Sequence, residues 1–339
     1  MKHLRTGVIG LGRMGQHHCR VYASQRESRL TGLFDIDSQI TRELSLRYGV
    51  PAYQNLDDLL DQVDAVSIAT PTPTHYDLVM RCLEHDVHVL VEKPVTETLE
   101  QAEELARAVE KSSLVVQVGH IERFNPTYLE LKKVIEDLNV IAMDFRRLSP
   151  YQMSTTDVDV VLDLMVHDLD LSNDLMRREP DSISAYGLTP FSIGFDHVVA
   201  LLCYANGPMV TLTASRVTEN KIRTVVVTAE KAFIEADFMN KHISVYRCSL
   251  GKYTDQKLNG VKYHQESIIE RILVPTVEPL ASEINHFLQC ITQNCMPCVS
   301  IFDGLKALQL ALQIRDSVDE QNQRLAAQPN WISIREGVK

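Results

Sequence analysis

A glycine-rich turn near the start of the chain restricts the possible folds more than any other stretch. The motif Gly10-Leu11-Gly12-Arg13-Met14-Gly15 directly follows the apolar residues 6–9 and leads into a helical pattern. This is the G-x-G-x-x-G pattern in its strand–turn–helix setting. Gly10 permits the tight turn, Gly12 lets a pyrophosphate approach the backbone, and Gly15 lets the helix pack on the sheet. The motif predicts a dinucleotide-binding α/β unit, and a glycine turn without a ligand is the alternative.

A second apolar stretch ends in an acidic residue. Residues 30–34 lead into Asp35, twenty residues after Gly15, where a carboxylate can accept hydrogen bonds from the adenosine ribose hydroxyls of a dinucleotide. Asp35 and Asp37 would both repel a 2′-phosphate, and no arginine follows closely to neutralise one. The pair therefore predicts NAD as the cofactor and makes NADP the less favoured alternative.

Short apolar stretches continue to alternate with helical patterns as far as residue 118. This alternation predicts six strands in an α/β Rossmann fold, a doubly wound parallel sheet. One strand, residues 87–91, runs into Glu92-Lys93-Pro94. Pro94 cannot continue the hydrogen-bond ladder, so the chain turns and presents Lys93 at the edge where open α/β sheets bind ligands. A solvated lysine in an ordinary strand-to-helix turn is the alternative.

Polar residues follow two further strand ends. His75 stands in the loop after residues 65–69, where it either begins the next helix or lines the cofactor crevice. The cluster 119–126, with His120, Arg123 and Asn125, follows the last predicted strand. Arg123 and Asn125 are candidates for substrate contact, and a structural salt bridge is the alternative for Arg123.

The second half of the chain has a different pattern of predicted strands and helices. Residues 142–147, 198–204, 209–215 and 223–228 have the pattern of antiparallel strands, and helical patterns cover 158–177, 280–294 and 302–320. Residues 251–266 are polar and predict a loop or hairpin tip. We expect an NAD-binding Rossmann domain over 1–122. Over 123–339 we expect a C-terminal α+β domain with an open, mainly antiparallel sheet for substrate binding and oligomerisation.

The predicted helix around residue 165 carries an acid and a histidine on one face. Asp163 and His167 are four residues apart, a spacing that brings both side chains together. The carboxylate could fix the tautomer of the imidazole and raise its basicity. Apolar neighbours predict that both are partly buried, and a core histidine beside solvated acids is the alternative. Acid–base chemistry is favoured over a metal, because Asp163, His167 and Asp170 do not naturally face one ion from a single helix.

Composition excludes several classes of partner. The formal net charge of −11 and the lack of a basic patch argue against nucleic acid, and no apolar run approaches the ~20 residues that span a bilayer. The chain starts without a signal-peptide pattern. Seven scattered cysteines favour a reducing cytoplasm over a disulfide framework. Cys295 and Cys298 have CxxC spacing without a second pair, so a metal or redox role is less favoured.

Three motifs in this order and spacing resemble those of the Gfo/Idh/MocA oxidoreductases over nearly the whole chain. They are the glycine turn followed by His18, the Glu92-Lys93-Pro94 tripeptide and the Asp163-x-x-x-His167 pattern. Residues 119–126 and 157–168 look most like the members that oxidise UDP-N-acetylglucosamine at C3. Relatives commonly carry glycines just before the catalytic aspartate, whereas this chain has Asp159 and three apolar residues there.

The resemblance implies an NAD-dependent dehydrogenase that acts on CH–OH groups and passes a hydride between a sugar hydroxyl or ketone and the nicotinamide. A nucleotide sugar such as UDP-N-acetylglucosamine, at C3, is the implied substrate. An inositol or free-sugar dehydrogenase is the first alternative, and a non-catalytic NAD-binding regulator is the second. A cytoplasmic homodimer or homotetramer, formed through the open sheet face, is also expected.

The resemblance also implies roles for individual residues. His167 would be the general base, Asp163 its orienting partner, and Lys93 the donor that stabilises charge on the same oxygen. The implied cofactor-binding residues are Gly10, Gly12, Arg13, Met14, Gly15, Asp35, Thr70, His75, Glu92, Lys93 and His120. The implied substrate-binding residues are Lys93, Arg123, Asn125, Asp163 and His167.

Overall fold

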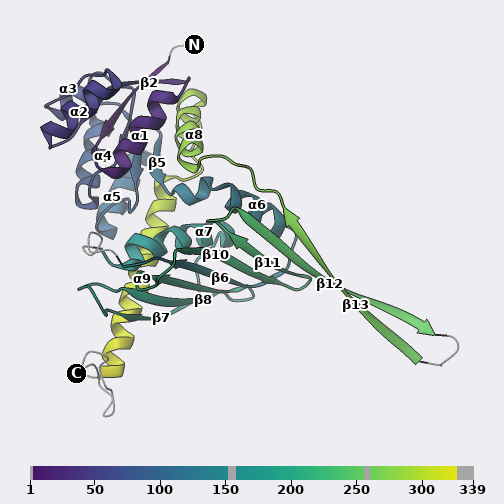
Figure 1. The fold of residues 1–339 in the computed structure, drawn as a ribbon. Helices are drawn as coiled ribbons and strands as arrows, with labels where there is room; N and C mark the ends of the chain where they lie inside the picture. Colours follow the sequence, from purple (N-terminus) through teal and green to yellow (C-terminus); the bar gives the residue numbers. More distant parts are fainter. Residues whose placement is uncertain (1–2, 152–157, 256–259, 327–339) are drawn as a thin grey trace. The chain divides into compact units, whose positions relative to one another are not determined.

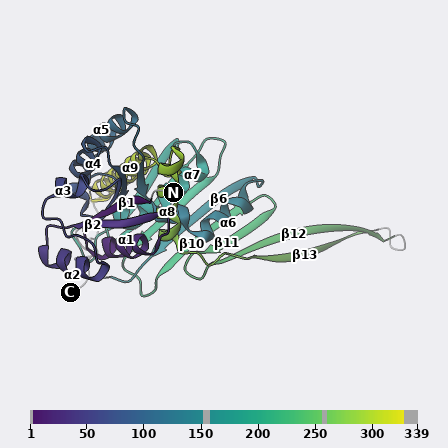
Figure 2. The same cartoon turned by 90° about the horizontal axis from the view of Figure 1, so that it is seen from above.

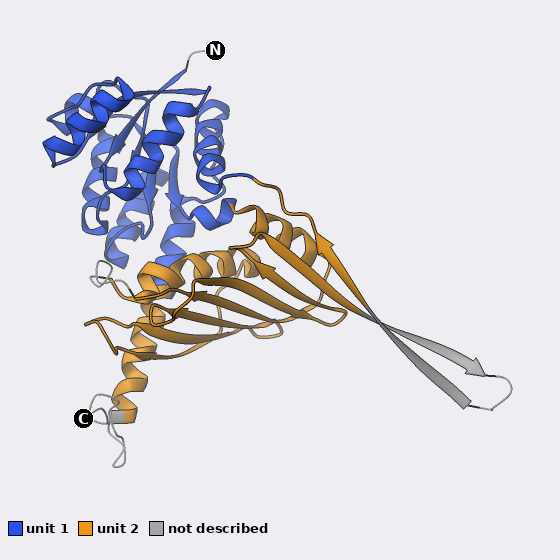
Figure 3. Ribbon diagram, in the orientation of Figure 1, with its two compact units in different colours: residues 1–124, 277–310 blue, residues 125–276, 311–339 orange. Residues whose placement is uncertain are grey.

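The computed structural model describes residues 3–151, 158–255 and 260–326. The chain forms two compact units, each assembled from two separate stretches (Figures 1 and 3). The first unit comprises residues 1–124 and 277–310, and the second comprises residues 125–276 and 311–339. The sequence analysis expected one division, between residues 122 and 123. The units differ from it because residues 277–310 return to the first unit.

A parallel five-stranded sheet forms the centre of the first unit, with the order β2-β1-β3-β4-β5. The predicted doubly wound Rossmann fold is confirmed, but the prediction of six strands was wrong. Between β2 and β3 the chain forms helices α2 (Ser38–Tyr48) and α3 (Leu56–Leu60), and Ala52 makes an isolated bridge to Leu33 instead of a strand. The strands are β1 Leu4–Ile9, β2 Ser28–Phe34, β3 Ala65–Ile68, β4 His88–Glu92 and β5 Val116–Gly119.

Four further helices belong to the first unit: α1 (Arg13–Ser24), α4 (His75–Glu84), α5 (Leu99–Glu110) and α8 (Pro279–Gln293). The last of these belongs here because its apolar face is buried in the same core as α1 and the sheet. That core includes Leu280, Ile284, Phe287 and Leu288 of α8 together with Cys19, Tyr22 and Leu90. Burial of such a face, more than local helix propensity, decides where a helix packs.

The carboxyl ends of the five parallel strands meet at one edge of the sheet. Gly10 follows β1, Asp35 follows β2, Thr70 comes two residues after β3, Lys93 follows β4 and His120 follows β5. The strand order changes direction between β1 and β3, and open α/β sheets bind ligands at such a switch point. The fold therefore gathers these predicted cofactor residues at the edge where the Rossmann fold binds dinucleotides.

An eight-stranded sheet, ordered β13-β12-β11-β10-β6-β9-β8-β7, forms the second unit (Figure 2). It is mainly antiparallel as predicted, and β6 and β9 pair in parallel. The stretch predicted as a loop or hairpin tip belongs to the β12–β13 hairpin, whose residues 256–259 lie outside the described part. The strands are β6 Val140–Leu148, β7 Ser182–Leu188, β8 His197–Cys203, β9 Met209–Ser215, β10 Ile222–Ala229, β11 Ala232–Asp237, β12 His242–Asp255 and β13 Gly260–Ile272.

Burial alternates along the strands of this sheet, so one face is covered and the other is open. In β7 and β8 the inward residues are buried, whereas Tyr186 and Val199 on the opposite face are exposed. The helices of the second unit are α6 (Pro126–Ile135), a π-helical turn η4 (Val161–Met165), α7 (Val166–Met176) and the part of α9 (Ile301–Ala326) that follows residue 310. Among the described helices, none is long and apolar enough to cross a membrane.

Candidate active site

The three glycines of the turn meet different demands. Gly10 has φ +85°, and a Cβ there would lie 2.6 Å from Thr70 Cγ2. At Gly15 a Cβ would lie 1.8 Å from the carbonyl oxygen of Gly10, so the helix can approach the strand only without a side chain. At Gly12 a Cβ would meet no protein atom within 4 Å. Packing explains Gly10 and Gly15, whereas the space at Gly12 is open for a bound group.

The N-terminus of α1 suits an anion. Gly12 is its N-cap, no side chain caps the helix, and no acidic residue lies in the first turn. The first N–H groups of a helix have no partner within it, and the helix dipole favours negative charge at this end. The backbone of Gly12, Arg13 and Met14 therefore fits the pyrophosphate of NAD.

We expect Gly12→Ala to fold normally and to bind NADH about tenfold more weakly or worse, a loss of ~1.4 kcal/mol. Gly12 has φ −64°, which alanine adopts without strain, and the added methyl group meets no protein atom. It would instead occupy the space left for the phosphates. Fluorescence titration with NADH and thermal unfolding measure the two properties. Gly15→Ala is the contrasting variant and should lose stability, whereas wild-type NADH affinity in Gly12→Ala would contradict this assignment.

Asp35 joins the glycine turn to the end of β2. Its Oδ2 accepts the N–H of Leu11 at 2.6 Å, and its Oδ1 accepts the N–H of Asp37 at 2.9 Å. These bonds hold the carboxylate beside the glycine turn, where it can accept further hydrogen bonds from a ribose. Asp37 has a second role, since its side chain caps α2. Ile36 between them is 97% exposed, an apolar side chain that the sequence analysis did not single out.

His75 ties two strand-end loops together. It begins α4 and its side chain is fully buried, with Nδ1 2.8 Å from the carbonyl oxygen of Pro94 and Nε2 2.9 Å from that of Thr70. Burial lowers the pKa of His75 below its usual value, although these carbonyl contacts oppose the shift. The helix-start alternative therefore describes its position, and contact with a cofactor stays a prediction.

Lys93 lies where the tripeptide predicts, directly after β4, and its side chain is half-buried. The carboxylate of Glu92 beside it lies 3.0 Å from His18 Nε2. A Cβ on Gly119, at the end of β5, would lie 3.2 Å from Glu92 Oε2, so the glycine leaves room for this carboxylate. The His18 contact was not foreseen, because its partner is far away in sequence.

The residues after β5 have structural contacts of their own. His120 and Arg123 are buried, and Arg123 Nη2 lies 3.6 Å from Asp303 Oδ1. This ion pair is the structural alternative stated for Arg123. Asn125 caps α6 by accepting the N–H of Thr127 at 3.0 Å. Cofactor contact by His120 and substrate contact by Arg123 and Asn125 stay predictions.

In the second unit, Asp163 and His167 stand on either side of a helical transition. Asp163 lies in the π-helical turn η4 and His167 in the first turn of α7. Both side chains are half-buried, as expected. A π-turn carries one more residue per hydrogen-bonded loop than an α-turn, and such turns often occur at functional sites. The i, i+4 pair is thus present, but not on the uniform α-helix that the spacing suggested.

The side chain of Asp159, four residues before Asp163, binds the first N–H groups of this turn. Its Oδ1 accepts the N–H groups of Val161 at 2.9 Å and Leu162 at 3.2 Å, and its carbonyl oxygen accepts the N–H of Asp163. Arg315 Nε lies 2.9 Å from Asp159 Oδ2. Asp159 therefore fixes the start of the turn that carries Asp163.

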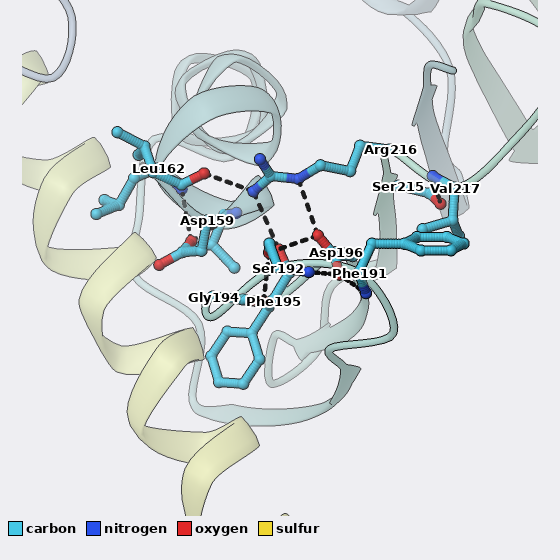
Figure 4. A network of polar contacts seen from close by, with 12 residues as sticks. Asp159, Leu162, Phe191, Ser192, Gly194, Phe195, Asp196, Ser215, Arg216 and Val217 are labelled. Atoms are coloured by element: carbon cyan, nitrogen blue, oxygen red, sulfur yellow. Dashed lines mark hydrogen bonds and ion pairs between the residues drawn. The ribbon is translucent and has the colours of Figure 1, made fainter. Parts of the chain in front are cut away.

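A buried ion pair supports the same segment (Figure 4). Arg216 Nε lies 3.4 Å from Asp196 Oδ1, and both side chains are buried. The guanidinium also donates to the carbonyl oxygens of Val158 and Phe195, and Phe195 accepts the N–H of Val160. This network holds residues 158–160 against the loop that contains Asp196.

Arg147 and Asp168 anchor the turn of α7 that carries His167. Arg147 on β6 donates from Nε to Asp168 Oδ2 at 3.0 Å and from Nη2 to Asp168 Oδ1 at 2.7 Å, with both side chains buried. A two-pronged contact of this kind fixes orientation as well as distance. Asp168 directly follows His167, so the pair restricts where the imidazole can lie.

The cysteines and metal-ligating residues add little to this site. Within the described ranges, no group of three His, Cys, Asp or Glu residues is arranged to hold a metal ion. Cys295 and Cys298 are exposed free thiols, and burial raises the pKa of the nearby Cys290 to about 12. A metal-free mechanism stays a prediction.

Comparison with known proteins connects both units to one family. Residues 4–120 match the model described as "Oxidoreductase family, NAD-binding Rossmann fold", and residues 138–235 match the GFO/IDH/MocA C-terminal domain. The chain is 33% identical to UDP-N-acetylglucosamine 3-dehydrogenase of Acidithiobacillus ferrooxidans over 96% of its own length and 100% of the relative. A solved structure with that name and source matches with a TM-score of 0.85 at 31% identity, covering 94% of this chain and 99% of the other. The scyllo-inositol 2-dehydrogenase (NAD(+)) of Bacillus subtilis is 25% identical over 94% of this chain and 95% of the relative.

Proposed function

This chain belongs to the Gfo/Idh/MocA family of NAD-binding oxidoreductases, and from that premise we propose that it oxidises the C3 hydroxyl of UDP-N-acetylglucosamine or a closely related nucleotide sugar. The observation that carries the proposal is 33% identity to a UDP-N-acetylglucosamine 3-dehydrogenase across the full length of that enzyme. Its solved counterpart matches at a TM-score of 0.85. Inositol dehydrogenases share the family but are more distant, at 25% identity for the Bacillus subtilis enzyme.

Three side chains are proposed to act on the reacting hydroxyl. His167 accepts its proton, Asp163 orients the imidazole, and Lys93 donates a hydrogen bond to the same oxygen as negative charge develops there. Their settings support these roles, because Arg147 and Asp168 restrict the turn of His167, and Lys93 directly follows the end of β4. Bound NAD supplies the hydride acceptor that amino-acid side chains lack.

A substrate panel tests the proposal. The protein is incubated with NAD and either UDP-N-acetylglucosamine, free N-acetylglucosamine, myo-inositol or scyllo-inositol, and NADH formation is followed by absorbance. We expect turnover with the nucleotide sugar and a C3 ketone as the product by mass spectrometry and NMR. Turnover of inositols alone would favour the inositol dehydrogenase alternative. Tight NADH binding without turnover of any polyol would favour the regulator, which has no need of Lys93, Asp163 and His167.

The second prediction concerns cofactor choice: NADH binds more tightly than NADPH. A 2′-phosphate would come close to the carboxylates of Asp35 and Asp37, and Asp35 is held at the end of β2 by two backbone N–H groups. Repulsion between the negatively charged phosphate and these carboxylates disfavours binding of NADPH. Fluorescence titrations of both reduced cofactors at two salt concentrations measure the difference, which should shrink at high salt. NADPH binding as tight as NADH binding would contradict the assignment.

The open face of the eight-stranded sheet is the proposed oligomer interface. It carries apolar side chains that are about half exposed, among them Tyr186, Val199 and Met209. Exposed apolar patches on sheets favour association with another protein surface. Light scattering should give the mass of a dimer or tetramer, and a monomer at micromolar concentration would exclude this interface. The cytoplasmic location stays a prediction.

A further inference from the structure

A chain of buried hydrogen bonds leads to the residue next to Lys93. Tyr22 Oη lies 2.8 Å from Ser67 Oγ, Ser67 Oγ lies 2.9 Å from His18 Nδ1, and His18 Nε2 lies 3.0 Å from Glu92 Oε1. Tyr22, Ser67 and His18 are fully buried, and the Glu92 side chain is 13% exposed. Helix α1 and strands β3 and β4 supply these groups, so the whole chain of contacts lies inside the first unit.

The chemistry of the four groups determines which of them donates in each of these hydrogen bonds. An ionised carboxylate only accepts hydrogen bonds, so His18 donates to Glu92 from Nε2. The Ser67 hydroxyl can then donate to His18 Nδ1, and the Tyr22 hydroxyl can donate to Ser67. Every hydrogen in the chain has one acceptor in this arrangement, as buried polar groups require. The arrangement holds the imidazole in one tautomer with its N–H aimed at Glu92.

Charged and titratable groups from three directions face the Glu92 carboxylate: His18 from α1, His75 from α4 and the adjacent Lys93. Burial alone raises the pKa of Glu92. The hydrogen bond from His18 and the electrostatic interactions with these three groups outweigh it, so the pKa of Glu92 lies below its usual value. At the other end of the chain, Glu283 and Cys19 face Tyr22, whose pKa is raised mainly by burial. Without His18, burial would dominate at Glu92 and favour the neutral acid.

We propose that His18 is a positioning residue for Lys93: by donating to Glu92 it keeps that carboxylate ionised and fixed beside the lysine ammonium. The proposal rests on the proposed catalytic role of Lys93. A fixed negative charge next to the ammonium restricts where its protons point, and Gly119 leaves the space that this carboxylate occupies. Neutral Glu92 would lose this attraction, so Lys93 would be held less well for the reacting oxygen.

Two variants separate this role from simple packing. His18→Leu fills the site but removes the donor, whereas His18→Gln keeps an N–H that can reach Glu92. We expect the acid limb of the kcat/KM profile to move to higher pH by ~1 unit or more in His18→Leu, which is about a tenfold loss on that limb. In His18→Gln the limb should stay near its wild-type position.

His88 provides a matched control in the same strand. It is a half-buried histidine at the opposite end of β4, and its Nδ1 accepts the N–H of Val115 at 2.9 Å. His88→Leu should lower thermal stability without moving the acid limb. A similar shift in both leucine variants would mean that lost packing, and not lost donation to Glu92, causes the effect.

Infrared spectroscopy of the apoprotein gives a readout that needs neither NAD nor a sugar. His18→Leu should gain the C=O band of a protonated carboxyl group near neutral pH, and the double variant with Glu92→Gln should lose that band. If no sugar is ever turned over, the proposed function fails while this measurement still tests the inference. If turnover is found but the band and the shifted limb are both absent, the inference is wrong and the proposed function stands.

Ser67→Ala keeps the test open if His18→Leu does not fold. It removes the partner of His18 Nδ1 but leaves the imidazole in place, so only the tautomer is no longer fixed, and a weaker band and a smaller shift of the limb are expected. Wild-type spectra and wild-type pH profiles in this variant and in every folded His18 variant would overturn the proposal.

Discussion

Replacing His167 by alanine should lower kcat by ~10²–10⁴-fold, the usual contribution of a positioned general base. The imidazole is proposed to take the proton from the sugar hydroxyl, so the loss should appear in the chemical step. NADH affinity should stay close to wild type, because the proposed dinucleotide site is built from the turn after β1 and from Asp35. Steady-state kinetics on the identified sugar and fluorescence titration with NADH measure the two quantities.

The control for His167→Ala is a second half-buried histidine in the same unit. His197 lies on β8, and burial lowers its pKa below the usual value. His197→Ala should affect stability more than turnover. If His167→Ala retains most of the wild-type kcat, His167 is not the base, and the core-histidine alternative from the sequence analysis would hold.

Lys93→Met should lower kcat more than it raises KM. An interaction that forms only as charge develops in the transition state behaves in this way. Removing one donor from such an oxyanion costs a few kcal/mol, or ~10²–10³ in kcat. Arginine should rescue poorly, because a planar guanidinium differs in shape from a compact ammonium. Steady-state kinetics and circular dichroism of Lys93→Met and Lys93→Arg provide the measurement.

An exposed lysine in the same unit serves as the control for Lys93→Met. Lys111 is the C-cap residue of α5 and its side chain is exposed, so Lys111→Met should leave kcat and KM unchanged. If Lys93→Met changes KM alone, Lys93 binds substrate and does not stabilise the transition state. If both kinetic constants stay at wild type, Lys93 is the solvated lysine of an ordinary turn.

The local features of the Rossmann unit could be predicted from sequence because short-range geometry determines them. A strand followed by Gly10, Gly12 and Gly15 has few alternatives, since Gly10 and Gly15 meet conformational and steric demands within the motif and Gly12 leaves space for a bound group. Asp35 and Lys93 were placed correctly because parallel strands bring their carboxyl ends to one edge. The strand pattern of the second unit was visible for the same reason, since side chains on a strand alternate between its two faces.

The predictions that were wrong concern segments whose local sequence pattern is compatible with more than one structure. The prediction of six strands counted alternation without determining which segments pair. The chain between β2 and β3 forms two helices and one isolated bridge. The spacing of Asp163 and His167 suggested a regular α-helix, but it does not show the π-turn whose first N–H group donates to Asp159.

Only the tertiary structure identified the supporting residues, because their partners are distant in sequence. His18 and Glu92 are 74 residues apart, and Arg147 and Asp168 come from a strand and a helix 21 residues apart. Helix α8 joins the first unit through burial of its apolar face, which no motif announces. By itself the sequence determined the dinucleotide turn, the strand-end lysine and the Asp163–His167 pair. The fold decided which buried groups hold them, since contacts across long sequence separations depend on packing rather than on local pattern.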